Sequence, residues 1–138
     1  MKTGFVINNI LHYSGLEALE KCKEGATIVD VREEHMIGHK CFNVEKLLFC
    51  PFSEIENQVE KLPKDHLLIL ADSTGLKSKE ATALCMKLGM HNVANLAGGL
   101  VDWERQGLPV AINARERLSG SCMCQLKYRN LKSNGKTK

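Results

Sequence analysis

The apolar run from Leu67 to Ala71, which leads directly into the polar segment from Asp72 to Ser78, constrains the fold more than any other feature of the sequence. A continuous apolar run of this length is typical of a strand that is covered on both faces, as in a parallel sheet. Parallel strands need crossover connections, which are usually helical. We therefore expect strands and helices to alternate along the rest of the chain.

The sequence on either side of this run has the expected alternation. Ser14 to Glu17 has the capping-box pattern and predicts a helix over 15–24, and Ser53 to Glu56 repeats the pattern and predicts a helix to about residue 61. Apolar runs of strand length lie at 26–31, 47–49 and 92–96. After the polar segment, helical spacing of Ala81, Leu84, Cys85 and Leu88 predicts another helix, and a last amphipathic stretch covers 100–107.

This alternation predicts an α/β domain with a mostly parallel sheet. Ligands of such sheets bind beyond the carboxyl ends of the strands. The segment from Asp72 to Ser78 follows the most apolar strand directly, so it is the leading candidate for a functional site.

Several short motifs occur in a characteristic order. They are Asp30-Val31-Arg32-Glu33, Gly38-His39, the segment 72–78, Lys87-Leu88-Gly89, Asn95-Leu96-Ala97-Gly98-Gly99, Trp103 and Gly107-Leu108-Pro109-Val110. In this order and spacing, they resemble the rhodanese-like domain family over about residues 8 to 110. The resemblance implies a three-layer fold, with a mostly parallel central sheet of about five strands flanked by helices.

The resemblance identifies residues 72–78 as the family's active-site loop, with one departure. Active rhodaneses have Cys-x-x-Gly-x-Arg-Ser, whereas this chain has Asp72, Ser73, Thr74, Gly75, Leu76, Lys77 and Ser78. Asp72 therefore occupies the position of the missing cysteine nucleophile, and the residues after it correspond to the anion-binding loop. The spacing matches the six-residue loop of sulfur-handling members rather than the seven-residue loop of related dual-specificity phosphatases.

The change from cysteine to Asp72 alters the chemistry that the loop can perform. Backbone amides at a helix N-terminus stabilise a thiolate or a persulfide, and a carboxylate also suits their partial positive field. A carboxylate oxygen, however, cannot take up and carry a sulfane sulfur by thiol exchange. We expect the ordinary transfer reaction to be absent. We also expect the Asp72 carboxylate to be bound by the loop amides, which together form an anion cradle, so that it acts as a ligand tethered to the chain.

A second departure from the family lies between His39 and Pro51, where this chain is a few residues longer and lacks the usual Gly-Ala. Because of this difference, the resemblance does not predict the backbone conformation of this segment. The fold assignment is not affected. We expect His39 to pack and to form hydrogen bonds rather than to take part in catalysis.

The cysteines leave two functions open. Without a secretion signal the six cysteines are interpreted as reduced thiols, with Cys41, Cys50 and Cys85 as packing residues. The leading interpretation is a binding or regulatory module in sulfur or redox metabolism, without conventional sulfurtransferase activity. The alternative is a sulfurtransferase or sulfur carrier that uses another thiol, such as Cys122 or Cys124. No cofactor is expected, and Cys122-Met123-Cys124 alone is weak evidence for a metal site.

Charge divides the chain into two parts. Residues 1–114 hold 12 Lys and Arg against 15 Asp and Glu, whereas residues 115–138 hold seven basic residues and one acidic residue. We expect a rhodanese-like domain over 1–112 and a basic, partly disordered tail over 113–138. A solvated tail is favoured over one that binds nucleic acid.

The expected partner is a protein or a small sulfur-containing anion, and the sequence leaves the oligomeric state open. No apolar run approaches the length of about 18 residues that a membrane span requires. We therefore expect a cytoplasmic protein with no membrane contact.

Overall fold

The computed structural model describes residues 4–38 and 40–112. The predictions for His39, for Cys122 and Cys124, and for the tail over 113–138 lie outside these residues. Within the described part of the chain, no helix is long and apolar enough to cross a membrane.

Eight strands and five α-helices make up the described part of the chain. The strands are β1 (Phe5–Ile7), β2 (Ile10–Tyr13), β3 (Thr27–Asp30), β4 (Lys40–Phe42), β5 (Leu47–Phe49), β6 (Leu68–Ala71), β7 (Val93–Leu96) and β8 (Val110–Ile112). The α-helices are α1 (Gly15–Lys23), α2 (Glu34–Ile37), α3 (Ile55–Gln58), α4 (Leu76–Lys87) and α5 (Gly99–Arg105). Two 3-10 turns, Phe52–Glu54 and Val59–Lys61, flank α3.

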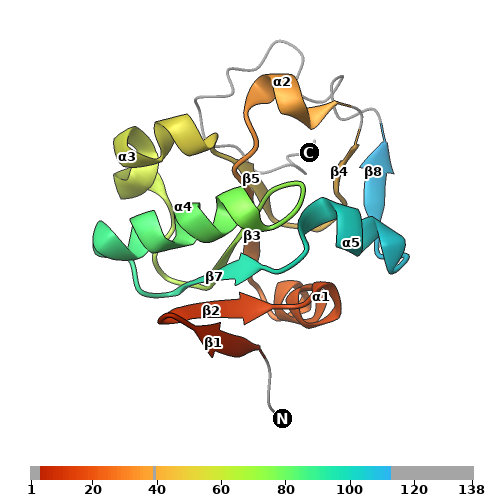
Figure 1. Ribbon diagram of the computed structural model, residues 1–138, viewed down its shortest axis with the longest axis horizontal. Helices are drawn as coiled ribbons and strands as arrows, with labels where there is room; N and C mark the ends of the chain where they lie inside the picture. The colour runs from red at the N-terminus through yellow and green to blue at the C-terminus, as the bar shows by residue number, and fades with distance from the viewer. Residues whose placement is uncertain (1–3, 39, 113–138) are drawn as a thin grey trace.

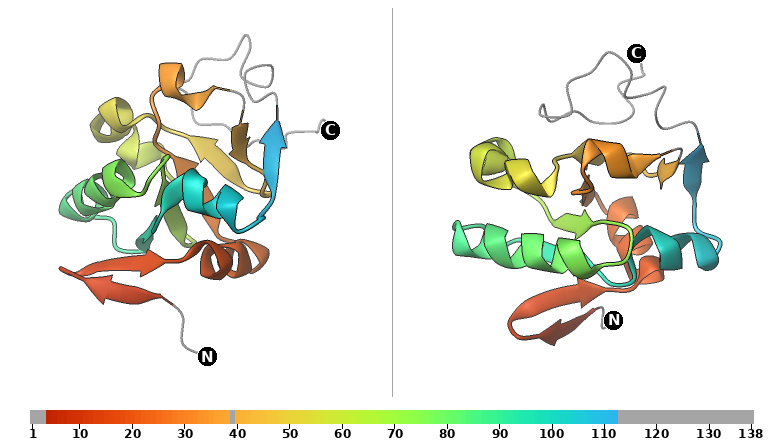
Figure 2. Two further views of the ribbon diagram at one scale, coloured as in Figure 1. Left: turned by 45° about the vertical axis from the view of Figure 1, so that its right-hand side comes forward. Right: turned by 45° about the horizontal axis from the view of Figure 1, so that its top comes forward.

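The main sheet has the strand order β1-β2-β7-β6-β3-β5. Strands β2, β7, β6, β3 and β5 are parallel, and β1 forms an antiparallel hairpin with β2 at one edge. A small second sheet pairs β4 with β8, at one side of the domain (Figures 1 and 2). The predicted α/β fold with a mostly parallel central sheet is confirmed.

Alternating side chains of the strands form two separate cores, one on each face of the sheet. Ile28 and Ile69 contribute to the core that includes α1 and α5, whereas Val29 and Leu70 contribute to the core under α3 and α4. The three layers are visible in Figure 1. Burial on both faces accounts for the continuous apolar runs in the sequence.

The two predicted capping boxes have different outcomes. At α1 the Ser14 hydroxyl accepts from the Glu17 amide, and the Glu17 carboxylate accepts from the Ser14 amide, as predicted. The prediction at Ser53 is wrong, because the Glu33 carboxylate accepts from both the amide and the hydroxyl of Ser53. The segment that follows is a 3-10 turn, one turn of α-helix and a second 3-10 turn, rather than one regular helix.

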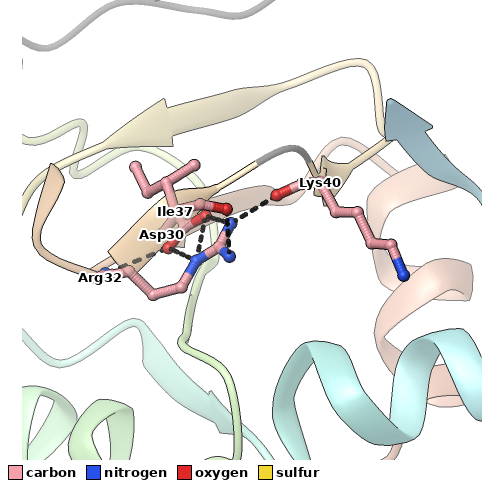
Figure 3. Close-up of polar contacts among 4 residues, drawn as sticks. All are labelled: Asp30, Arg32, Ile37 and Lys40. Atoms are coloured by element: carbon pink, nitrogen blue, oxygen red, sulfur yellow. Dashed lines mark hydrogen bonds and ion pairs between the residues drawn. The ribbon is translucent and has the colours of Figure 1, made fainter. Parts of the chain in front are cut away.

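A buried ion pair fixes the chain where it leaves β3. The Arg32 guanidinium donates to the Asp30 carboxylate across 2.7 Å, and both side chains are almost fully buried. It also donates to the carbonyl oxygens of Ile37 and Lys40 (Figure 3). These bonds tie the carboxyl end of β3 to α2 and to the start of β4, and so order the segment next to the candidate loop.

Candidate active-site loop

The loop over 72–78 begins where β6 ends and runs into the first turn of α4. Gly75 is the N-cap of α4 and has a φ of +93°, a backbone conformation that favours glycine. A Cβ atom at Gly75 would also lie 2.8 Å from the amide nitrogen of Gly98. Only glycine therefore fits this turn without displacing the neighbouring chain.

The start of α5 packs against the same loop. The amides of Leu100 and Val101 donate to the carbonyl oxygens of Asp72 and Ser73, at 2.9 and 3.0 Å. A Cβ atom at Gly99 would lie 2.5 Å from the Ser73 carbonyl oxygen. Close contact between backbones thus explains Gly99, whereas a Cβ atom at Gly98 would meet the side chain of Asp102.

The carboxylate of Asp72 lies inside the loop. It is 7% exposed, and it accepts hydrogen bonds from the amides of Gly75 at 2.6 Å and Lys77 at 3.2 Å and from the Ser78 hydroxyl at 3.1 Å. These donors belong to the N-terminus of α4, where the helix dipole also favours a negative charge. The carboxylate makes the contacts expected of a tethered ligand in an anion cradle.

The remaining loop residues have different environments. Ser78 is fully buried beneath the carboxylate, and Ser73 is partly buried. Thr74, Leu76 and Lys77 are exposed. The Lys77 ammonium lies 4.8 Å from the centre of the Phe52 ring and 3.7 Å from the Glu80 carboxylate, contacts that lie outside the cradle.

Two residues behind the loop were not predicted from the sequence. The Ser78 hydroxyl lies 2.5 Å from Asn95 Oδ1, and Asn95 Nδ2 lies 3.1 Å from Nδ1 of His12. Asn95 and His12 are both buried and are direct neighbours across β7 and β2. Their contact depends on the pairing of two strands that are far apart in the sequence, which no local pattern reveals.

The described cysteines are packing residues, as predicted for Cys41, Cys50 and Cys85, which are all fully buried. Burial raises the pKa of Cys50 to about 12 and that of Cys85 to about 11. It also raises the pKa of the partly buried Cys22 to about 12. Among residues 4–38 and 40–112, no group of three or more His, Cys, Asp or Glu residues could hold a metal ion.

Comparison with known sequences gives a consistent result. The family model described as the Rhodanese-like domain matches residues 15–106. A protein named "Sulfurtransferase" from Allochromatium vinosum is 31% identical over 87 residues, which cover 63% of this chain and 79% of that protein. Rhodanese-like domain-containing protein 17 of Arabidopsis thaliana is 32% identical over 113 residues, which cover 72% of each chain.

Solved structures have the same fold. A rhodanese-related protein from Thermoplasma volcanium superimposes with a TM-score of 0.62 at 25% identity, covering 72% of this chain and 96% of that one. The rhodanese-like domain of an Anabaena protein superimposes with a TM-score of 0.65 at 18% identity, covering 80% of this chain and 86% of that one.

Proposed function

Because the chain belongs to the Rhodanese-like domain family, we propose that it is a binding or regulatory module in sulfur or redox metabolism that lacks conventional thiosulfate sulfurtransferase activity. The observation that carries this proposal is the Asp72 carboxylate, bound by the amides of Gly75 and Lys77 at the N-terminus of α4. In this proposal, Asp72 stands where the family's sulfur-accepting cysteine would be.

The chemistry of the carboxylate supports the absence of transfer. A persulfide forms when a thiolate attacks a sulfane sulfur, because sulfur is a polarizable nucleophile that can carry the transferred atom. A carboxylate oxygen does not undergo this exchange. The loop keeps its amide donors and its helix dipole. It has no thiol, however, on which the transferred sulfur could be held as a persulfide.

The occupied cradle also affects what the domain would bind. Asp72 already accepts from two loop amides and from Ser78, so a sulfur-containing anion would have to compete with a tethered negative charge. Two negative charges that share one buried loop repel each other strongly, because the effective dielectric constant of a buried site is low. A protein partner that contacts the exposed loop residues Thr74, Leu76 and Lys77 is therefore favoured over a small anion.

The alternative function is a sulfurtransferase or sulfur carrier that uses a different thiol. It is supported by the relative from Allochromatium vinosum, which is named a sulfurtransferase. Buried thiols with raised pKa values are poor nucleophiles, which argues against Cys22, Cys50 and Cys85. The substitute would then be Cys122 or Cys124, in the proposed tail over 113–138.

The two functions are distinguished by incubating the full chain with thiosulfate or polysulfide, assaying transfer to cyanide, and mapping any added sulfur by peptide mass spectrometry. The binding-module proposal predicts no turnover and no preferential persulfide. Turnover together with an added sulfur on Cys122 or Cys124 would contradict it and would support the alternative.

A further inference from the structure

We propose that Asn95 and His12 are positioning residues that turn the single hydroxyl hydrogen of Ser78 toward the side chain at position 72. The proposal rests on the proposed function in one respect, namely that position 72 holds the functional group of the loop. It adds a buried chain of side chains that prepares this position for a negative charge.

This series of hydrogen-bonded side chains lies on the α4 face of the sheet. Ser78 Oγ lies 3.1 Å from Asp72 Oδ1 and 2.5 Å from Asn95 Oδ1, and Asn95 Nδ2 lies 3.1 Å from His12 Nδ1. Ser78 is fully buried, and Asn95 and His12 are 2% and 5% exposed. The hydrogen bonds among these buried side chains therefore have to satisfy one another.

The number of available hydrogens determines which side chain donates in each contact of this series. A serine hydroxyl has one hydrogen, and the Ser78 hydroxyl donates to Asp72 Oδ1, so this contact uses that hydrogen. Ser78 Oγ would then accept from Asn95. This requires the amide to be turned over relative to its orientation in the structure, so that its NH₂ group faces Ser78 and its oxygen faces His12. The amide oxygen in turn requires a hydrogen on His12 Nδ1.

The opposite orientation of the Asn95 amide is less favourable. This is the orientation in the structure, where the Ser78 hydroxyl faces Asn95 Oδ1 and Asn95 Nδ2 faces His12 Nδ1. In it, one hydroxyl hydrogen has to serve two acceptors, Asp72 Oδ1 and Asn95 Oδ1. His12 would then carry its hydrogen on Nε2, which is buried and has no hydrogen-bond partner among the described residues. A buried donor without an acceptor is rare in folded proteins. The first orientation gives every contact of the chain one hydrogen.

His12 is suited to a fixed tautomer. Its ring stacks on Phe5 at a centroid distance of 5.1 Å, and its pKa is lowered by burial and by the nearby charge of Lys79. Both effects favour the neutral imidazole, which carries one hydrogen only. A neutral His12 with its hydrogen on Nδ1 fixes the orientation of the Asn95 amide. The amide then donates to Ser78 Oγ, so the Ser78 hydroxyl donates toward position 72.

The orientation can be measured in the wild-type protein without any ligand. Long-range proton–nitrogen correlation spectra of the nitrogen-15-labelled full chain at about pH 7 report which ring nitrogen of His12 carries the hydrogen. We expect a protonated Nδ1 and an unprotonated Nε2. A hydrogen on Nε2 would overturn the proposal. Since this measurement does not depend on sulfur transfer, its failure would leave the proposed function untouched.

The effect on position 72 can be measured as the pKa of the thiol introduced by Asp72→Cys, from the pH dependence of its alkylation. Adding Asn95→Leu or Ser78→Ala removes the directed hydrogen and should lower the acid dissociation constant of the thiol by about tenfold, the effect of one hydrogen bond to a charged group. Adding His12→Leu should lower the acid dissociation constant of the thiol by less than this. Adding His12→Asn instead, which restores a donor near the place of Nδ1, should return the constant to its value in the Asp72→Cys variant.

Thr82→Val is the matched control, because Thr82 is fully buried on the same helix and its hydroxyl donates to the carbonyl oxygens of Ser78 and Ala94. This variant should leave the acid dissociation constant of the thiol unchanged. If Asn95→Leu has no effect while Ser78→Ala does, or if Thr82→Val has as large an effect as Asn95→Leu, the positioning role is wrong.

Discussion

The carboxylate of Asp72 and the amide nitrogen of Gly75 lie 2.6 Å apart, at the point where β6 meets the N-terminus of α4. Gly75 has a left-handed backbone conformation, and its amide donates to the carboxylate. The same turn packs against Gly98 of the next loop. In the proposed function, Asp72 takes the place of the sulfur-carrying residue of an active rhodanese and is a group that the loop already binds.

We expect Asp72→Ala to open an anion site. The variant leaves the Gly75 and Lys77 amides without their acceptor, so sulfate or thiosulfate should bind and shift the amide NMR signals of both residues. The unfolding free energy without anion should fall by about 1–3 kcal/mol, because buried donors are left unpaired. Asp65→Ala is the control, since Asp65 is exposed near the opposite end of β6. Equal anion binding by both variants would contradict the role of the cradle.

The buried pair of Asp30 and Arg32 should be far more sensitive than a surface pair. Arg32→Ala leaves an unpaired carboxylate with 0% exposure, and we expect it to lower the unfolding free energy by about 3–5 kcal/mol in urea titrations. Arg105→Ala breaks a largely exposed ion pair with Asp102 and should change it by less than about 1 kcal/mol. Similar losses for the two variants would show that the pair does not hold the end of β3.

The raised pKa of Cys85 predicts a loss of stability in alkali. Its thiol ionises near the ordinary value of 9.0 in the unfolded chain and at about 11 in the folded protein. Between these values the unfolded state binds fewer protons, so the unfolding free energy falls as pH rises. Cys85→Ala should show a smaller fall between about pH 9 and pH 11 than the wild type. An identical pH dependence would rule out this contribution.

The proposed domain boundary predicts that a chain truncated after Asn113 stays folded. Strand β8 ends at Ile112, and its pairing with β4 is retained in the truncated chain. We expect the unfolding free energy to change by no more than about 0.5 kcal/mol in urea titrations. A larger loss would place part of the folding energy in the tail and would contradict the boundary.

Much of the fold could be predicted because local signals and tertiary structure agree. The apolar runs at β3, β5, β6 and β7 are strands, and the capping box at Ser14 begins a helix. The hairpin of β1 and β2 was missed, although Asn8 and Asn9, both with positive φ, mark a tight turn between two apolar segments. The second capping box failed because Glu33, distant in sequence, takes the Ser53 donors.

The candidate site was only partly accessible from the sequence. Residues 72–78 lie in one continuous segment, so their spacing alone identifies a loop at the end of a strand. Asn95 and His12 come from two other strands, and only the register of β2 against β7 places them beside Ser78. Such register depends on long-range packing, which a single sequence does not specify.

The central claim is that a carboxylate in place of a thiol at position 72 is what removes sulfur transfer. It is tested most directly by one polysulfide assay, with mass spectrometry of the product, on the wild type, Asp72→Cys and Asp72→Ser. We expect an added sulfur at position 72 in Asp72→Cys only, together with some transfer to cyanide. Transfer by the wild type, or equal transfer by Asp72→Ser and Asp72→Cys, would contradict the claim.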